Sequence, residues 1–133
     1  MTEYIAEDVL RFFEKAPRLL PLYQALEKRI SAEFEDVRIK VQKTQITFAN
    51  HRNFACVWQP ALSARKKLRD RPDAYLVVTF GLLYRLDSPR IEAAVEPYPN
   101  RWTHHVVIER EEELDEELMG WIREAYALSA GKR

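Results

Sequence analysis

Hydrophobic residues in the first 35 positions recur with the spacing of amphipathic helices. A first helix is predicted by one such group, which consists of Ile5, Val9, Phe12 and Phe13. Ala16 precedes Pro17, and a residue in that position is pushed out of the helical region, so this helix ends or bends there. A second helix begins near Pro21, and its hydrophobic stripe consists of Leu22, Leu26, Ile30 and Phe34.

The period of the pattern changes from helical to two at Val37. Hydrophobic and polar residues alternate over residues 37–42, which is typical of a strand with one buried and one wet face. Ile46 and Phe48 continue the alternation, but on even instead of odd positions. Because a regular strand cannot exchange its faces, this change of parity indicates a bulge or a tight turn near residues 42–44.

Further strands are predicted over residues 54–58, 75–80, 91–95 and 102–109. The second of these is hydrophobic throughout, as expected for a central strand that is covered on both faces. A last helix opens at Asp115, and its buried stripe consists of Leu118, Trp121, Ile122 and Ala125. The order α-α-β-β-β-β-β-α predicts one α+β domain over residues 1–133, in which two N-terminal helices and one C-terminal helix pack on a mostly antiparallel five-stranded sheet.

Composition restricts the class of protein. No hydrophobic run approaches the roughly 20 residues that span a bilayer, and the acidic start of the chain lacks the features of an export signal. Cys56 is the single cysteine, so an internal disulfide is excluded. These features predict a cytoplasmic protein without a membrane partner, and they leave the oligomeric state open.

Charge is segregated along the chain although the net charge is zero. Residues 36–110 carry 13 basic and 7 acidic side chains, whereas both flanking segments are acidic. Either acidic helices and basic strands offset each other, or a basic end of the sheet meets an anion. The most basic run, residues 65–71, is more typical of a solvated loop than of a nucleic-acid patch.

The stretch richest in candidate chemistry is residues 96–108, where a turn with two prolines leads into a strand. Arginine offers a planar fork that matches carboxylate or phosphate, and an aromatic ring can stack on a base or a sugar. We therefore expect an anion-binding site at strand ends and turns, formed by Lys43, Thr44, Gln45, Arg52, Arg90, Tyr98, Arg101, Trp102, His104 and His105. Within this set, Lys43, Arg101 and one of the two histidines are predicted to converge.

An alternative interpretation of the same stretch is structural. In it, Trp102 packs in the core and the arginines pair with nearby carboxylates, namely Asp87, Glu92 and Glu96.

Metal chemistry is not favoured, because His104 and His105 are adjacent on a strand and point to opposite faces. Cys56 is expected to share a strand face with Phe54 and Trp58, which indicates packing rather than reactivity. No glycine-rich phosphate loop or dinucleotide motif is present, so no cofactor is expected.

Several segments of the chain resemble a known family. They are residues 41–48 (VQKTQITF) with residues 52–55 (RNFA), residues 98–105 (YPNRWTHH), and residues 114–118 (LDEEL). On these segments the chain resembles a family of small bacterial proteins catalogued as domain of unknown function 5655. More distantly, its layout is similar to the small α+β domains named after YdhG, some of which have been linked to iron handling. The resemblance implies a fold more than a function.

Two functions of different classes follow from the sequence. The favoured one is a binding module whose basic strand ends hold an anionic small molecule or a nucleic acid, through a nucleotide or nucleic-acid phosphate. The alternative is an enzyme that uses His104 or His105 as a general base on an anionic substrate. The enzyme needs a histidine in a cleft within hydrogen-bond reach of a second polar group, whereas the module needs only charge and shape.

Overall fold

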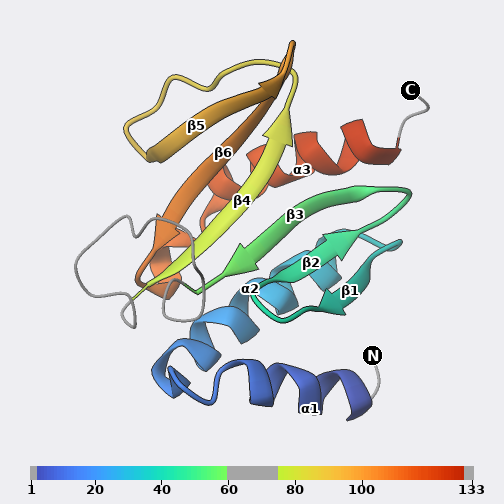
Figure 1. Cartoon of the computed structure of the whole chain (residues 1–133), viewed down its shortest axis with the longest axis vertical. Helices are drawn as coiled ribbons and strands as arrows, with labels where there is room; N and C mark the ends of the chain where they lie inside the picture. Colours follow the sequence, from blue (N-terminus) through green and yellow to red (C-terminus); the bar gives the residue numbers. More distant parts are fainter. Residues whose placement is uncertain (1–2, 60–74, 131–133) are drawn as a thin grey trace.

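The computed structural model describes residues 3–59 and 75–130 (Figure 1). The helices are α1 (Glu3–Phe12), α2 (Leu20–Glu33) and α3 (Glu116–Ala130), with short 3-10 turns at Pro17–Leu19 and Glu111–Glu113. The strands are β1 (Arg38–Val41), β2 (Ile46–Ala49), β3 (Asn53–Trp58), β4 (Leu76–Leu82), β5 (Ile91–Tyr98) and β6 (Arg101–Ile108). The basic run at residues 65–71 lies outside the described residues.

These strands form one antiparallel sheet in the order β1-β2-β3-β4-β6-β5. The α+β class and the antiparallel sheet predicted from the sequence are confirmed, but the count of five strands is wrong. The change of parity after Val41 is a tight turn, closed by a 2.8 Å hydrogen bond from the Gln42 N–H to the Gln45 carbonyl. The chain therefore reverses there and forms β1 and β2 in place of one bulged strand.

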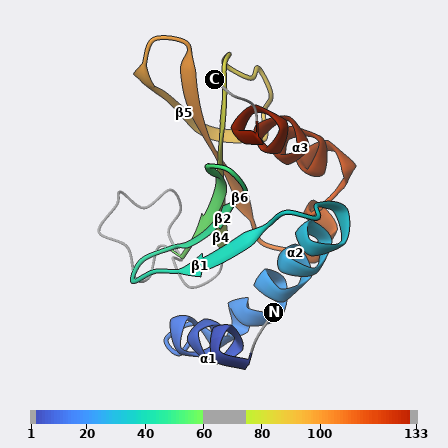
Figure 2. The same ribbon diagram turned by 90° about the vertical axis from the view of Figure 1, so that its right-hand side faces the viewer.

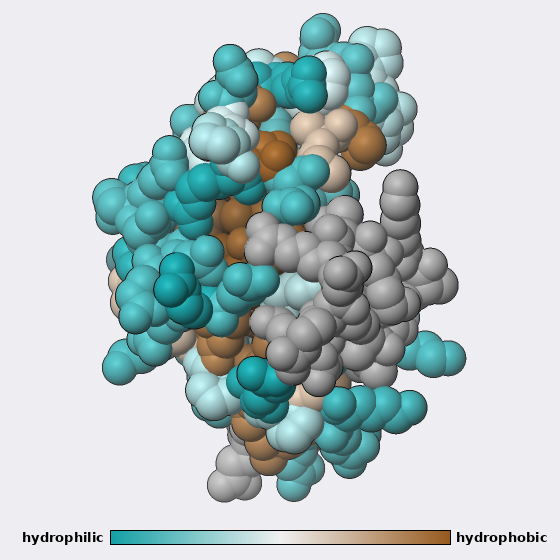
Figure 3. All heavy atoms as spheres, turned by 90° about the vertical axis from the view of Figure 1, so that its left-hand side faces the viewer, coloured by the Kyte–Doolittle hydropathy of each residue, from teal (hydrophilic) through white to brown (hydrophobic). Residues whose placement is uncertain are grey.

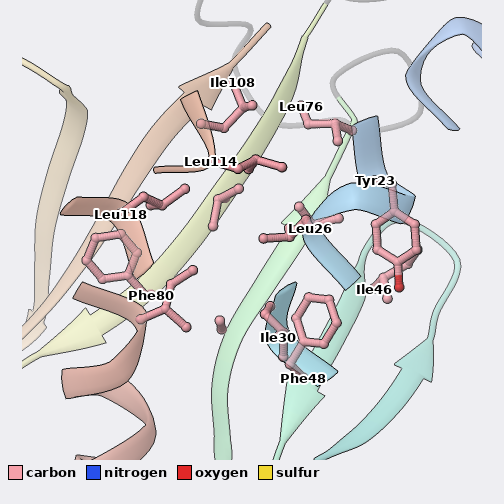
Figure 4. Packing of buried hydrophobic residues seen from close by; sticks show 14 of the residues in the cluster. Tyr23, Leu26, Ile30, Ile46, Phe48, Leu76, Phe80, Ile108, Leu114 and Leu118 are labelled. Atoms are coloured by element: carbon pink, nitrogen blue, oxygen red, sulfur yellow. The ribbon is translucent and has the colours of Figure 1, made fainter. Parts of the chain in front are cut away.

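The hydrophobic core lies between the helices and one face of the sheet (Figures 2 and 4). The stripe predicted for the second helix is buried, since Leu22, Leu26, Ile30 and Phe34 are all at most 8% exposed. Residues on alternate positions of the strands meet this stripe from the sheet. Among them are Ile46, Phe48, Phe80 and Ile108 (Figure 4). Helices α2 and α3 cover this face, which we call the helix face. The opposite face carries a second, smaller buried cluster of Trp58, Tyr75, Val77 and Val107, and we call it the open face because no described helix packs on it.

Helix α3 is fixed to the sheet by polar contacts at its start. Asp115 Oδ1 accepts a 3.1 Å hydrogen bond from the Leu118 N–H, as an N-cap residue does. Arg90, which directly precedes β5, donates to Asp115 at 2.8 Å and to Glu117 at 3.1 Å, and its guanidinium lies 5.9 Å from the centre of the Trp121 ring. Burial opposes the ionisation of Asp115, but the hydrogen bonds from Arg90 and from the Leu118 N–H prevail and lower the pKa of its carboxyl.

A bulge in β3 redirects one aromatic side chain. Phe48 pairs with Ala55, but the next residue of β2, Ala49, pairs with Asn53, so Phe54 is the extra residue. Its ring therefore leaves the open face that its position in the alternation predicts and packs edge-on against Phe34. The expectation that Phe54 shares a face with Cys56 is wrong for this reason.

On the side of the molecule seen in Figure 3, hydrophilic side chains cover most of the described surface and hydrophobic ones form small, interrupted patches. Within residues 3–59 and 75–130, the helices are too short or too polar to cross a bilayer.

Candidate functional site

Four segments that are far apart in the sequence enclose a cavity at one end of the sheet. They are the turn between β2 and β3 with the start of β3, the end of β4, the tip of the β5–β6 hairpin, and the last turns of α3 (Figure 1). The cavity has a volume of about 170 Å³. Its lining consists of Arg52, Asn53, Phe54, Gly81, Leu82, Pro97, Tyr98, Arg101, Trp102, Thr103, Ala125, Leu128 and Ser129. We call it the arginine cavity.

The β5–β6 hairpin places Arg101 at the rim of the arginine cavity. Tyr98 pairs with Arg101, so the turn consists of Pro99 and Asn100 alone. Asn100 has a φ of 64°, and a proline followed by a residue with positive φ is the sequence of a type II turn. The Asn100 N–H donates a 2.9 Å hydrogen bond to Glu96 Oε2, which braces the turn. Arg101 thus directly follows a turn that is held by a hydrogen bond.

The β2–β3 turn places Arg52, and it is held by Asn50. The Asn50 side chain is buried, at 1% exposure, and its Oδ1 accepts hydrogen bonds from the Arg52 N–H and from Ser129 Oγ. Its Nδ2 donates to the Tyr126 carbonyl at 3.1 Å. One amide side chain therefore joins the turn that carries Arg52 to the end of α3.

The lining of the arginine cavity is basic and aromatic. It contains two guanidinium groups, from Arg52 and Arg101, and none of the lining residues is acidic. The side chain of Arg101 has no hydrogen-bond or ion-pair partner within the described part of the chain. Tyr98 is 67% exposed, so its ring is available at the mouth, and the Trp102 ring has the Arg85 guanidinium 5.8 Å from its centre.

His104 and His105 point to opposite faces, and neither lines the arginine cavity. His104 is buried on the helix face, stacks on Phe80 with ring centres 5.3 Å apart, and accepts a 3.0 Å hydrogen bond at Nε2 from the Leu86 N–H. Burial lowers the pKa of His104. The positive charge of Arg85 lowers it further, while the Phe80 backbone opposes the shift.

His105 belongs to the open face. Its Nδ1 lies 2.8 Å from Thr79 Oγ1, and the same oxygen accepts a 3.0 Å hydrogen bond from Trp58 Nε1. Thr79 lines a second cavity of about 290 Å³, together with Gln45, Thr47, Asn53, Phe54, Ala55, Cys56, Phe80, Gly81 and Thr103. The arginine cavity and this second cavity share Asn53, Phe54, Gly81 and Thr103, so they are neighbours across the end of the sheet.

The remaining predicted site residues lie elsewhere. Lys43 and Thr44 occupy the β1–β2 turn, which is at the end of β2 remote from Arg52 (Figure 1). The expected convergence of Lys43 with Arg101 and a histidine is therefore wrong. Gln45 donates a 2.9 Å hydrogen bond to Thr47 and lines the second cavity. Arg90 is engaged with the start of α3, so its donors serve the fold.

Sequence reasoning missed Asn50, Leu128 and Ser129, which hold or line the arginine cavity. Asparagine side chains often bond the backbone of turns, but that preference does not identify the end of α3 as the partner of Asn50. Within the described residues, no three histidine, cysteine or acidic side chains gather as a set of metal ligands.

Comparison with known proteins identifies the family. The model of the family described as "Domain of unknown function (DUF5655)" matches residues 9–129. The chain belongs to that family. The resemblance noted in the sequence is thus confirmed for this family, and the more distant likeness to YdhG-type domains stays a prediction. No curated protein and no solved structure matches the chain significantly.

Proposed function

We propose that this protein is a binding module that holds an anionic ligand, through a nucleotide or nucleic-acid phosphate, in the arginine cavity. The observation that carries the proposal is the lining of that cavity. Arg52 and Arg101 come from separate turns to one cavity that is also lined by three aromatic residues and by no acidic residue. Two guanidinium groups without a lining carboxylate favour an anion.

The size of the arginine cavity limits what part of a ligand enters it. A cavity of roughly 150 Å³ accommodates a benzene-sized group, so about 170 Å³ admits a phosphate or a single ring. The phosphate is bound by the two arginines, and a ring that it carries stacks on the exposed face of Tyr98. The Tyr126 carbonyl near the end of α3 accepts hydrogen bonds from Asn50 and Ser129, which reduces its repulsion of an anion.

The test is a calorimetric titration with adenosine 5′-monophosphate. Arg101→Ala removes one guanidinium from an exposed position, so we expect the affinity to fall by about tenfold or more while the melting temperature is unchanged. Arg18→Ala is the matched control, because Arg18 is an exposed arginine in the turn before α2. Equal affinities of the Arg101→Ala and Arg18→Ala variants would contradict the proposal.

One observation favours the enzyme alternative as a second candidate. The His105 ring is within hydrogen-bond reach of Thr79, which lines the cavity next to the arginine cavity. p-Nitrophenyl phosphate combines a single ring with a phosphate and is a suitable probe. Release of nitrophenol by the protein, lost in His105→Gln, would support catalysis. Binding of the probe without turnover would leave the module as the function.

A further inference from the structure

We propose that the ligand is a phosphorylated sugar that extends beyond the arginine cavity, over Gly81, onto a row of threonine hydroxyls on the open face. This inference rests on the proposed function, because the phosphate is placed between Arg52 and Arg101. It adds the subsite for the neutral part of the ligand.

The path between the two cavities passes over Gly81. Gly81 lies on β4 with its missing side chain on the open face, two residues after Thr79, and it lines both cavities. A Cβ placed on Gly81 would have the Trp102 carbonyl oxygen at 3.8 Å as its nearest neighbour, which is ordinary contact. The absence of a side chain here is therefore not required by packing, and Gly81 projects no side chain between the residues that line the two cavities.

Three threonines lie along this path, Thr103 on β6, Thr79 on β4 and Thr47 on β2, with Cys56 of β3 between the last two. Thr103 pairs with Gly81, Thr79 pairs with Cys56, and Cys56 pairs with Thr47, so the three hydroxyls share the open face. All three line the second cavity. That lining contains hydroxyl, amide and thiol groups but no charged side chain. Such a surface suits neutral hydroxyls, as a sugar presents them, better than a second anion.

The hydroxyls of Thr79 and Thr103 keep capacity for a ligand, whereas that of Thr47 already donates to Gln42 and accepts from Gln45. A threonine hydroxyl has one donor and two acceptor positions. Thr79 uses one acceptor position for Trp58 and one further position for His105, which leaves one. Thr103 has no side-chain hydrogen bond within the described part of the chain. The ring nitrogen of His105 and the indole of Trp58 fix the orientation of the Thr79 hydroxyl before a ligand arrives.

The experiment compares a short with a long ligand on a variant that closes the path. Gly81→Val places a branched side chain between the two cavities and suits a strand. Inorganic phosphate, ribose 5-phosphate and an RNA tetranucleotide are titrated by calorimetry against the wild type and Gly81→Val, with melting temperatures as the control of folding. We expect the affinity for the ligands that carry a sugar to fall by about tenfold or more, and the affinity for inorganic phosphate, which does not reach past Gly81, to fall much less.

A second variant removes one hydroxyl without filling space. Thr103→Val is isosteric and should weaken the binding of ribose 5-phosphate by about fivefold, the effect of one hydrogen bond, and the binding of inorganic phosphate by less. Ribose 5-phosphate and the tetranucleotide together show whether the phosphorylated sugar is a free metabolite or part of a nucleic-acid chain. A free metabolite is indicated if ribose 5-phosphate binds as tightly as the tetranucleotide, and a nucleic-acid chain if the tetranucleotide binds more tightly.

The outcomes that overturn the inference are distinct from failure of the proposed function. If Gly81→Val and Thr103→Val bind ribose 5-phosphate and the tetranucleotide as the wild type does, while Arg101→Ala weakens all three ligands, the subsite is refuted and the anion module stands. If the wild type binds none of the three ligands, the proposed function and the subsite both fail.

Discussion

Ser129 Oγ donates a 2.5 Å hydrogen bond to Asn50 Oδ1, although 79 residues separate the two side chains. This bond, with the one from Asn50 Nδ2 to the Tyr126 carbonyl, attaches the β2–β3 turn to the last turns of α3. Because Asn50 Oδ1 also accepts from the Arg52 N–H, the attachment fixes the backbone from which Arg52 extends. One buried amide thus connects the arginine cavity to the packing of α3 on the sheet.

Asn50→Ala should therefore reduce both stability and phosphate binding. It leaves the Ser129 hydroxyl without this acceptor and releases the turn, so the free energy of unfolding should fall by about 1–3 kcal/mol. Chemical denaturation measures this loss, and titration with adenosine 5′-monophosphate measures the accompanying drop in affinity. His51→Ala, at an exposed position of the same turn, is the control and should change neither quantity. A stable Asn50→Ala variant with full affinity would show that the amide does not organise the turn.

Val78→Asp tests the placement of the central strand. Val78 is 1% exposed and pairs with Val57 on one side and Val106 on the other. An unpaired carboxylate at this position should cost several kcal/mol, about as much as the whole stability of a small domain. Val95→Asp, the same change at a position that is 51% exposed on β5, should leave the melting temperature nearly unchanged. Similar melting temperatures for the two variants would show that β4 is misplaced.

Arg90→Ala should weaken the fold but not the binding of ligand. The side chain is 23% exposed and bonds Asp115, Glu117 and the Glu113 carbonyl, so its loss frees the start of α3 from the sheet. A cost of about 1–2 kcal/mol is expected in chemical denaturation. If Arg90→Ala instead loses affinity for phosphate and keeps the stability of the wild type, Arg90 binds the ligand and does not stabilise the fold.

Stability should depend on the protonation of His104. The pKa of this buried ring lies below its ordinary value of 6.5, so at mildly acid pH the unfolded chain binds more protons than the folded one. The stability that neutral His104 contributes is fully present above about pH 6.5. It is lost as the pH falls through the lower pKa that this ring has in the folded state. Protonation also converts Nε2 from an acceptor into a donor and breaks the bond from the Leu86 N–H.

The measurement is the free energy of unfolding at pH 7.5 and at lower pH. His104→Gln should be less stable than the wild type at pH 7.5 and should lose less stability on acidification. His51→Gln, which changes an exposed histidine, should keep the pH dependence of the wild type. If His104→Gln and the wild type lose equal stability, His104 does not titrate in the way that its burial indicates.

The helices and central strand followed from the sequence because burial imposes a period on hydrophobic residues. The stripe from Leu22 to Phe34 and the buried Val78 are direct results of that period. Parity alone could not decide between a bulge and a turn after Val41, since both exchange the faces of a strand. The same limit applies to Phe54, whose direction is set by a bulge that depends on the pairing of β2 with β3.

The candidate site was predicted in part for a related reason. Arginines, aromatic residues and turns are visible in the sequence, but which turns meet depends on strand order and direction. Strand β2 runs from the turn of Lys43 toward the turn of Arg52, so only Arg52 reaches the end of the sheet that carries Arg101. Arg90 finds its partners 25 and 27 residues away on the start of α3, and local spacing does not encode such a contact.

The most direct test of the anion site is a map of amide chemical shifts in a titration with adenosine 5′-monophosphate. We predict that the amide signals of Arg52, Arg101 and Thr103 move with one common dissociation constant, and that the signal of Lys43 at the far turn stays in place. Arg101→Ala should abolish these shifts at the same ligand concentration. Shifts confined to the Lys43 turn, or the same shifts in Arg101→Ala as in the wild type, would contradict an anion site between Arg52 and Arg101.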